Sequence, residues 1–353
     1  MAIERISIEN FTVFDKIEID FCKGVNIFIG ENGTGKTTLL KLLYAWCNVD
    51  VNEHSEFLTR SIKNFNDLKL SEQLIQALKN SDHTDSWYRE IIKLYSVGAF
   101  SNFTDVVFES YPFGEEYLLG IEPSFNQFKE KQKIPSIFIP PSEMLSHTKG
   151  FPEHYEEYDI PFDDTQIDII KKARLNATRE LKPLAKKLLS TVSKIIDGEV
   201  LYENDTFYIV KNNGAKIPFS MEAEGFRKFG LLWKLLRNGL FDKAGTVLLW
   251  DEPEANLNPT LIPVLVDILL ELSRGGVQIF LATHDSNLVQ YFDTKKANKE
   301  DVMFHSLYKG EDKQIYCESS HTYHELENKA IEEADAELGN FIIQKAIEEL
   351  DNL

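Results

Sequence analysis

The sequence predicts an α/β fold in which the strands of a mainly parallel central sheet alternate with helices. Three short apolar runs are typical of strands that are buried on both faces: Val25–Ile29, Thr246–Trp250 and Val277–Ala282. A helical pattern follows the first run at Thr38–Trp46, and a second one, Pro259–Arg274, separates the other two runs. Because strands and helices alternate along the chain, we expect the strands to lie parallel in one sheet.

Further elements are expected around this sheet. Alternating or short apolar patterns predict strands at Ile3–Ile8 and Ile17–Phe21 (joined by a turn within Asn10–Lys16), Phe103–Phe108, Tyr117–Ile121, Ser136–Ile139, Val200–Tyr202, Thr206–Val210, Lys216–Phe219, Val302–Leu307 and Gln314–Glu318. Helical patterns cover Glu53–Tyr95, Asp163–Ile196 with a break at Pro183, Gly225–Asn238 and His324–Leu350. We therefore expect one domain over residues 1–353, with a helical and antiparallel β insert at 48–133, a helical lobe at 160–198 and a C-terminal helix at 322–353.

Composition restricts the classes of function. The 353 residues are 43% hydrophobic, which is ample for a packed core. The formal charge of −19 opposes indiscriminate binding to nucleic acid, although it leaves room for one local basic groove. Three cysteines far apart in the sequence favour a reducing compartment. Met1–Asn10 lacks the apolar stretch of a signal peptide, and Leu261–Leu272 is too short to cross a bilayer, so we expect a cytoplasmic protein without a membrane partner.

The segment Gly30–Thr37, GENGTGKT, follows the first buried strand and has the pattern G-x-x-x-x-G-K-[ST] of a phosphate-binding loop. Its glycines allow a tight bend that directs backbone N–H groups inward, and the following helix places its positive end there. Lys36 is expected to reach the β- and γ-phosphates, and the Thr37 hydroxyl to ligate Mg²⁺. The alternative is a glycine-rich turn that binds nothing, which the flanking strand and helix disfavour. The predicted nucleotide-binding residues are Gly30, Glu31, Asn32, Gly33, Thr34, Gly35, Lys36, Thr37 and Thr38.

A second signal is Val247–Pro259, VLLWDEPEANLNP, in which a buried strand ends in two carboxylates. Ligands of open α/β sheets bind at the carboxyl ends of the strands. Asp251 is therefore expected to hold Mg²⁺ and Glu252 to polarise the water that attacks the γ-phosphate. The alternative is an acidic pair that caps the next helix, and the phosphate-binding loop elsewhere in the chain makes it the weaker interpretation.

The third signal is His284, in FLATHDS, directly after the strand Val277–Ala282. A lone histidine most often has a structural hydrogen bond. At the end of the strand that follows the Asp-Glu strand, it could instead contact a γ-phosphate and respond to its presence. We favour the second role for His284.

Together with the opening IERISIENFTVFDKIEIDF, these segments resemble the ABC-type ATPase superfamily. The resemblance is strongest to its soluble branch, which includes RecF, the SMC heads, and OLD-like and related AAA ATPases of bacterial anti-phage systems. It covers most of the chain from Ile3 to about His284, with Glu53–Lys133 unassigned. The resemblance implies an ABC-type P-loop ATPase head that uses ATP and Mg²⁺ and pairs head-to-tail, with each nucleotide held between two subunits. The loop Ala255–Pro259 would cross that interface, with Asn258 where transporters usually carry Asp.

The signature loop departs from the pattern of these ATPases. The corresponding segment, Met221–Lys228, reads MEAEGFRK. Gly225 and Arg227 match the small-G-x-R pattern of the soluble branch and are assigned to nucleotide binding by that resemblance. Ala223 stands where a phosphate-contacting Ser is expected, and Glu224 adds negative charge. Either Arg227 and the helix N-terminus compensate, or the contact between subunits is weak and hydrolysis is slow. Ser142 or Glu143 occupies the place of the Q-loop glutamine.

The preferred function is an ATPase whose ATP-driven dimerisation regulates a separate effector, with a nuclease as one candidate, in anti-phage defence. The segment after His284 is too short for a further nuclease domain. One alternative is a RecF-like DNA-binding repair ATPase that uses the basic run Lys171–Lys194, although a solvated helix face explains that run as well. Less favoured are a transporter motor and an ATP-locked scaffold.

Two further motifs are interpreted as chance matches. Asn298–Asp301, NKED, has the guanine-selecting pattern N-K-x-D, but no buried strand precedes it. Cys317, His321 and His324 supply three of the four ligands that a structural zinc site needs.

Overall fold

The computed structural model describes residues 2–48, 105–111, 115–119, 134–151, 164–328 and 344–345. Its centre is a six-stranded sheet with the strand order β13-β12-β3-β11-β10-β6. Five strands are parallel, and only β13 runs antiparallel to its neighbour among the described residues. The strands are β3 (Val25–Gly30), β6 (Ser136–Ile139), β10 (Val247–Asp251), β11 (Gln278–Thr283), β12 (Val302–Lys309) and β13 (Ile315–Ser320). The predicted mainly parallel α/β sheet is confirmed.

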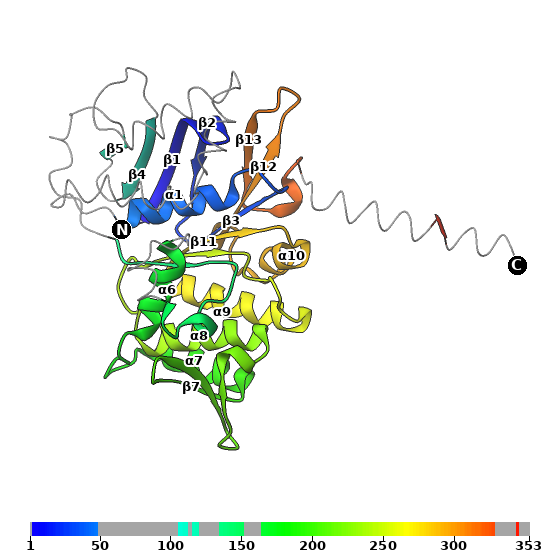
Figure 1. Ribbon diagram of the computed structural model, residues 1–353. Coiled ribbons are helices and arrows are strands. Elements are labelled where there is room, and N and C mark those ends of the chain that lie inside the picture. Colours follow the sequence, from blue (N-terminus) through cyan, green and yellow to red (C-terminus); the bar gives the residue numbers. More distant parts are fainter. Residues whose placement is uncertain are drawn as a thin grey trace, which may run out of the picture.

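The two faces of this sheet are covered by different layers, because successive side chains of a strand point to opposite faces. In β10, Leu248 and Trp250 belong to one apolar cluster, whereas Val247 and Leu249 belong to the other. The helix α1 (Lys36–Asn48) packs on the second face. Beyond the first face are stacked α7 (Pro183–Ile196), α8 (Glu224–Arg237) and α9 (Ile262–Arg274) (Figure 1). Every residue of β3, β10 and β11 is buried, as expected for strands that are covered on both sides.

A second sheet is antiparallel and has the order β2-β1-β4-β5. Its strands are β1 (Ala2–Phe11), β2 (Phe14–Asp20), β4 (Asp105–Tyr111) and β5 (Glu115–Leu119). Figure 1 shows α1 between the β1–β2 hairpin and the central sheet. The predicted antiparallel β subdomain is present, and it joins two distant segments of the chain, because β4 pairs with β1 from Ala2 to Glu9. The remainder of the insert, including the helical pattern Glu53–Tyr95, lies outside the described residues.

The first face of the central sheet carries the two helices of the predicted helical lobe, α6 (Asp164–Arg174) and α7 (Pro183–Ile196). With them lie α8 (Glu224–Arg237) and a small sheet of β7 (Gly198–Glu203), β8 (Thr206–Lys211) and β9 (Lys216–Pro218). The predicted helix Asp163–Ile196 is two helices, separated by residues 175–182. The predicted break is therefore present, and Pro183 begins α7, where a first-turn proline lacks only an N–H that has no intrahelical partner.

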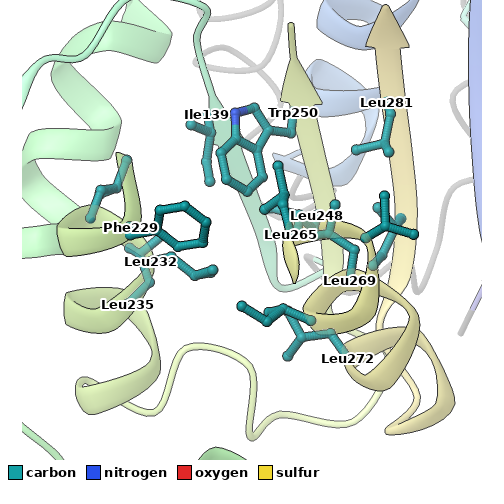
Figure 2. Packing of buried hydrophobic residues seen from close by; sticks show 14 of the residues in the cluster. Ile139, Phe229, Leu232, Leu235, Leu248, Trp250, Leu265, Leu269, Leu272 and Leu281 are labelled. Atoms are coloured by element: carbon teal, nitrogen blue, oxygen red, sulfur yellow. The ribbon is translucent and has the colours of Figure 1, made fainter. Parts of the chain in front are cut away.

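Shorter elements complete the chain. They are η2 (Leu145–His147), η3 (Phe219–Met221), η4 (Pro259–Leu261), α9 (Ile262–Arg274), α10 (Ser286–Lys295), η5 (Lys299–Asp301) and η6 (Tyr323–Glu325). Figure 2 shows how α8 and α9 meet the sheet: Phe229 and Leu232 of α8 and Leu265 and Leu269 of α9 converge on Leu248 and Trp250 of β10. This packing fixes α8 against the strand that carries Asp251.

The predicted start of the C-terminal helix at His324 is wrong. His324 lies in the short η6 turn, and residues 326–328 are not helical. The reason is a tertiary contact, because the Glu318 carboxylate accepts the backbone N–H groups of Glu327 and Asn328, at 2.8 and 3.1 Å. The rest of that predicted helix, apart from residues 344–345, lies outside the described residues. Among the helices that are described, none is both long and apolar enough to cross a bilayer.

Candidate functional site

The carboxyl ends of three neighbouring strands meet at one edge of the central sheet. β11 lies between β3 and β10, and all three run parallel. Asp251 pairs with Ala282, and Thr283 pairs with Ile29, so the strands end almost level. The glycine-rich loop, the Asp251–Glu252 pair and His284 therefore leave the sheet side by side.

The loop conformation depends on its glycines. Gly30 and Gly35 have φ values of 150° and 90°, which residues with a side chain rarely adopt. A Cβ on Gly30 would lie 2.2 Å from the carbonyl oxygen of Leu307, and one on Gly35 would lie 2.3 Å from the ring of Phe14. Both glycines thus allow the loop to pass close to other segments. The loop tip, Glu31, Asn32 and Gly33, is exposed, whereas Thr34 is buried and its hydroxyl donates to the Glu31 carbonyl oxygen at 2.9 Å.

Lys36 is the first residue of α1 and folds back over the loop. Its Nζ donates to the carbonyl oxygens of Gly30 and Glu31, at 2.6 and 2.8 Å. Burial lowers the pKa of Lys36, and the nearby carboxylates of Asp251 and Glu252 oppose that shift. The positive charge is therefore held inside the loop, where a phosphate group would meet it. The helix begins two residues earlier than the predicted Thr38, so Thr38 lies within its first turn.

Thr37 and Asp251 are joined directly. The Thr37 Oγ1 donates to Asp251 Oδ2 at 2.8 Å, across 214 residues of sequence. Asp251 is 3% exposed, and burial raises its pKa, whereas the bond from Thr37 lowers it. A hydroxyl and a carboxylate in contact at a strand edge are hard oxygen ligands of the kind that Mg²⁺ prefers. The donor set therefore suits a magnesium ion bound together with phosphate oxygens.

Glu252 and His284 lie next to each other beyond the end of the sheet. The Nδ1 of His284 is 3.4 Å from Glu252 Oε1, and the two side chains are 54% and 35% exposed. The backbone N–H of Glu252 donates to the Ala282 carbonyl oxygen at 2.9 Å. Both side chains are thus open to a ligand. Of the predicted site residues, the structure brings together Lys36, Thr37, Asp251, Glu252 and His284.

A second buried carboxylate was missed by the sequence reasoning. Glu254 Oε1 accepts a hydrogen bond from the Thr283 hydroxyl at 2.6 Å, and burial raises the pKa of Glu254. The sequence signal was available, because Glu254 stands in the same DEPEANLNP segment as Asp251 and Glu252. Asp285, the residue after His284, accepts the Leu288 N–H and caps α10.

Gly225 and Arg227 lie in the first turn of α8, apart from the loop. The position of a Cβ on Gly225 is 3.5 Å from the Asn256 carbonyl oxygen, so this turn contacts the segment after Glu252. Arg227 Nη1 is 3.3 Å from Glu143 Oε2, and Glu143 also accepts the N–H groups of Leu145 and Ser146. Burial raises the pKa of Glu143, and Arg227 opposes that shift. Glu143, one of the two residues expected at the Q-loop place, is therefore an ionic partner of Arg227 from the expected signature segment.

The two chance motifs have other roles. Asn298 and Asp301 form a capping box at the start of η5. The Nδ1 of His321 lies 2.8 Å from the Val302 carbonyl oxygen, and Cys317 Sγ lies near the Ser319 hydroxyl. Over the ranges that the structure describes, no group of three or more His, Cys, Asp or Glu side chains is arranged to hold a metal ion.

The parallel sheet, the loop that encloses Lys36 and the Thr37–Asp251 contact define an ATPase head of the ABC, RecF and SMC type, as the sequence predicted. Residues 25–290 match the model of the family described as "AAA domain, putative AbiEii toxin, Type IV TA system", and the chain belongs to this family. A protein of Helicobacter pylori named "ATP/GTP phosphatase" is 21% identical over 334 residues, which cover 82% of this chain and 87% of that protein.

Two other similarities are more limited, the first in length and the second in sequence identity. The DNA replication and repair protein RecF of Cytophaga hutchinsonii is 47% identical over 47 residues, which are 13% of this chain and 12% of RecF. A crystal structure of an Smc head bound to the C-winged helix domain of ScpA matches with a TM-score of 0.50 and 14% identity, covering 90% of this chain and 97% of that chain. At this level of identity the second match supports the fold alone.

Proposed function

We propose that this protein binds ATP with Mg²⁺ at the edge of the sheet and hydrolyses it to ADP and phosphate. The observation that carries the proposal is the contact between Thr37 Oγ1 and Asp251 Oδ2, next to the Lys36 ammonium. A glycine-rich loop, a lysine and an oxygen pair at one strand edge together suit the phosphates of a nucleoside triphosphate and its metal ion.

Each residue has a distinct role in the proposed reaction. The loop N–H groups and Lys36 bind phosphate oxygens, while Thr37 and Asp251 hold the magnesium ion, which supplies positive charge to those oxygens. Glu252 accepts a proton from the water whose oxygen attacks the γ-phosphorus. The bond between that phosphorus and the β–γ bridging oxygen then breaks, which leaves ADP and phosphate. His284 donates to the γ-phosphate and, through its contact with Glu252, responds to the presence of that phosphate.

A second copy of the chain completes the site in this proposal. Glu252 and His284 are open to solvent, and Met221, just before the signature turn, is 81% exposed. These features support a head-to-tail dimer in which Gly225 and Arg227 of one subunit approach the nucleotide of the other. Ala223 caps α8 without a side-chain hydrogen bond, and Glu224 is acidic, so the contact between subunits is weak and hydrolysis slow.

The ATP-bound dimer regulates a separate effector in anti-phage defence, and a nuclease is one candidate for that effector. The description of the family names a toxin–antitoxin system, which supports a role in defence. The similar Smc head is bound to a domain of ScpA, which supports a separate protein partner. Neither fixes the partner of this chain. Binding of ATP would shift the population from monomer to dimer and present a new surface to the effector.

The test compares the Glu252→Gln variant with the wild type in phosphate release and in size-exclusion chromatography with Mg²⁺ and ATP. We expect the variant to lose hydrolysis and to elute as a stable dimer with ATP and as a monomer without it. Glu199→Gln, on the exposed surface of β7, is the matched control and should behave as wild type. Unchanged hydrolysis in Glu252→Gln would remove Glu252 as the base, and a monomer under all conditions would remove the dimer.

A DNA-binding repair ATPase is the second candidate, suggested by the short similarity to RecF. The basic run that would serve it is partly used within the fold. Lys187 bonds Glu271 at 2.7 Å, Lys182 donates to the Asp242 carbonyl oxygen, and Arg174 donates to the Thr148 carbonyl oxygen at 3.1 Å. Salt-dependent binding to double-stranded DNA, lost when charges along Lys171–Lys194 are reversed, would favour this candidate; no binding at low salt would exclude it.

A further inference from the structure

The second turn of α8 begins with a buried lysine that the proposed reaction does not use. Lys228 is 3% exposed and lies on the side of the helix that packs into the core. Its neighbour Phe229 points toward the strand β10 (Figure 2). Burial of an ammonium group is unfavourable unless the group is hydrogen-bonded and near opposite charge, so the surroundings of this side chain matter.

The ammonium group of Lys228 bonds to the backbone of the proposed catalytic glutamate. Its Nζ donates to the carbonyl oxygen of Glu252 at 3.1 Å, and the same oxygen accepts the N–H of Ala255 at 3.1 Å. On its other side, the N–H of Glu252 donates to the carbonyl oxygen of Ala282. Both backbone polar groups of Glu252 are thus held, one of them by a side chain from a different element.

These contacts matter because Glu252 has an unusual backbone conformation. Its φ is 47°, in the left-handed region that residues with a side chain rarely adopt. Such a conformation persists only where the surroundings hold it, and it sets the direction in which the carboxylate leaves the chain. Lys228 supplies one of the hydrogen bonds that hold this backbone.

The carboxylates around Lys228 favour its charged form. Burial lowers its pKa, and the carboxylates of Glu254, Glu224, Glu252 and Asp251 oppose that shift, with Glu254 the largest of the four. Glu254 is itself buried and bonded to Thr283 of β11. The lysine therefore lies among the carboxylates that follow β10, and α8 brings it there.

We infer that Lys228 is a positioning residue that holds the backbone of Glu252 in its left-handed conformation, and so aims the Glu252 carboxylate. The inference rests on the proposed role of Glu252 as the base. Lys228 also joins that base to the turn of α8 that carries Gly225 and Arg227. A shift of this turn when a second subunit docks would move the Lys228 ammonium and, with it, the backbone of Glu252.

The test is the Lys228→Met variant, which keeps most of the side-chain volume and removes the donor. We expect kcat for ATP hydrolysis to fall at least tenfold, while the Kd for a fluorescent ATP analogue stays within twofold of the wild-type value. Lys234→Met is the matched control, since Lys234 lies on the same helix, is partly buried and makes no bond to Glu252; it should leave both quantities unchanged. A kcat within twofold of this control, or a Kd that rises in step with the loss of kcat, would overturn the inference.

Lys228→Met removes a positive charge that interacts with the buried Glu254 and could for that reason fail to fold. The double variant Lys228→Met/Glu254→Gln removes that excess charge, and it is compared with Glu254→Gln alone. A further tenfold loss of kcat in the double variant supports the inference, and equal kcat values overturn it. Glu252→Gln separates the two proposals. Unchanged turnover in that variant would remove Glu252 as the proposed base, whereas its loss together with normal turnover in Lys228→Met would contradict only the role of Lys228.

Discussion

The ion pair between Glu143 and Arg227 allows a quantitative test of how the first turn of α8 is held against the Glu143 segment. Arg227 Nη1 and Glu143 Oε2 are 3.3 Å apart, and their side chains are 19% and 1% exposed. At an effective dielectric constant of about 20, two unit charges at this distance attract by about 5 kcal/mol. Desolvation of both groups offsets much of that attraction, which leaves a coupling energy of about 2 kcal/mol.

The assay is a double-mutant cycle of Arg227→Met and Glu143→Gln, followed by equilibrium urea unfolding without nucleotide. Glutamine keeps an oxygen that can accept the N–H groups of Leu145 and Ser146, so Glu143→Gln removes mainly the charge. We expect Arg227→Met to lower the free energy of unfolding by about 3 kcal/mol, because it leaves a buried carboxylate without its partner. In the Glu143→Gln background the same change should cost about 1 kcal/mol.

The pH dependence gives an independent check. Burial already raises the pKa of Glu143, and loss of Arg227 would raise it further. A raised folded-state pKa means that the folded state holds the proton more tightly than the unfolded state, so stability is lost as the pH rises. The destabilisation by Arg227→Met should therefore be smaller at pH 5 than at pH 8. Single-variant effects that add within about 0.5 kcal/mol would refute the coupling.

Three further predictions follow from other parts of the structure. Gly35→Ala should destabilise the protein by about 3 kcal/mol, because the added Cβ would meet the Phe14 ring in a left-handed backbone. Gly33→Ala, with φ 82° and no atom within 4 Å of the added Cβ, should cost about 1 kcal/mol. Equal losses of the two variants in thermal unfolding would contradict the clash at Gly35. Burial lowers the pKa of His305 from 6.5 to about 3, so protonation favours the unfolded state as the pH falls from 6 to 4. Over this range the free energy of unfolding of the wild type should fall more steeply than that of His305→Gln, by about 1.4 kcal/mol per pH unit. Equal slopes for the two proteins would contradict a neutral histidine in the folded state. Removal of Mg²⁺ with EDTA should weaken ATP binding at least tenfold in a fluorescence titration, and an unchanged Kd would exclude a metal-assisted site.

The segments that the sequence predicts well are those whose structure is determined locally. The strand β3, the glycine-rich loop and α1 are adjacent in sequence, and β10 is a short apolar run that ends in two carboxylates. The order of the strands in each sheet is harder to predict from the sequence. The pairing of β4 with β1, across about a hundred residues, carries no local signal and could not be read from either strand alone.

In the candidate site, too, some residues could be predicted from the sequence and others could not. Lys36, Thr37, Asp251, Glu252 and His284 stand in motifs of fixed spacing, and the structure brings them together. The contacts that hold the signature turn, by contrast, join residues 84 and 24 positions apart: Arg227 with Glu143, and Lys228 with Glu252. A lysine within the apolar stripe of an amphipathic helix was the one available sign of the second contact.

The central claim is that a nucleoside triphosphate and its metal ion bind between the Gly30–Thr37 loop and Asp251. The most direct measurement is a crystal structure of the Glu252→Gln variant with ATP and Mn²⁺, in which anomalous scattering locates the metal. We predict one manganese peak per subunit, bonded to Thr37 Oγ1 and near the Asp251 carboxylate, with the γ-phosphate beside Lys36. A nucleotide elsewhere, or manganese bound away from Thr37 and Asp251, would contradict the account.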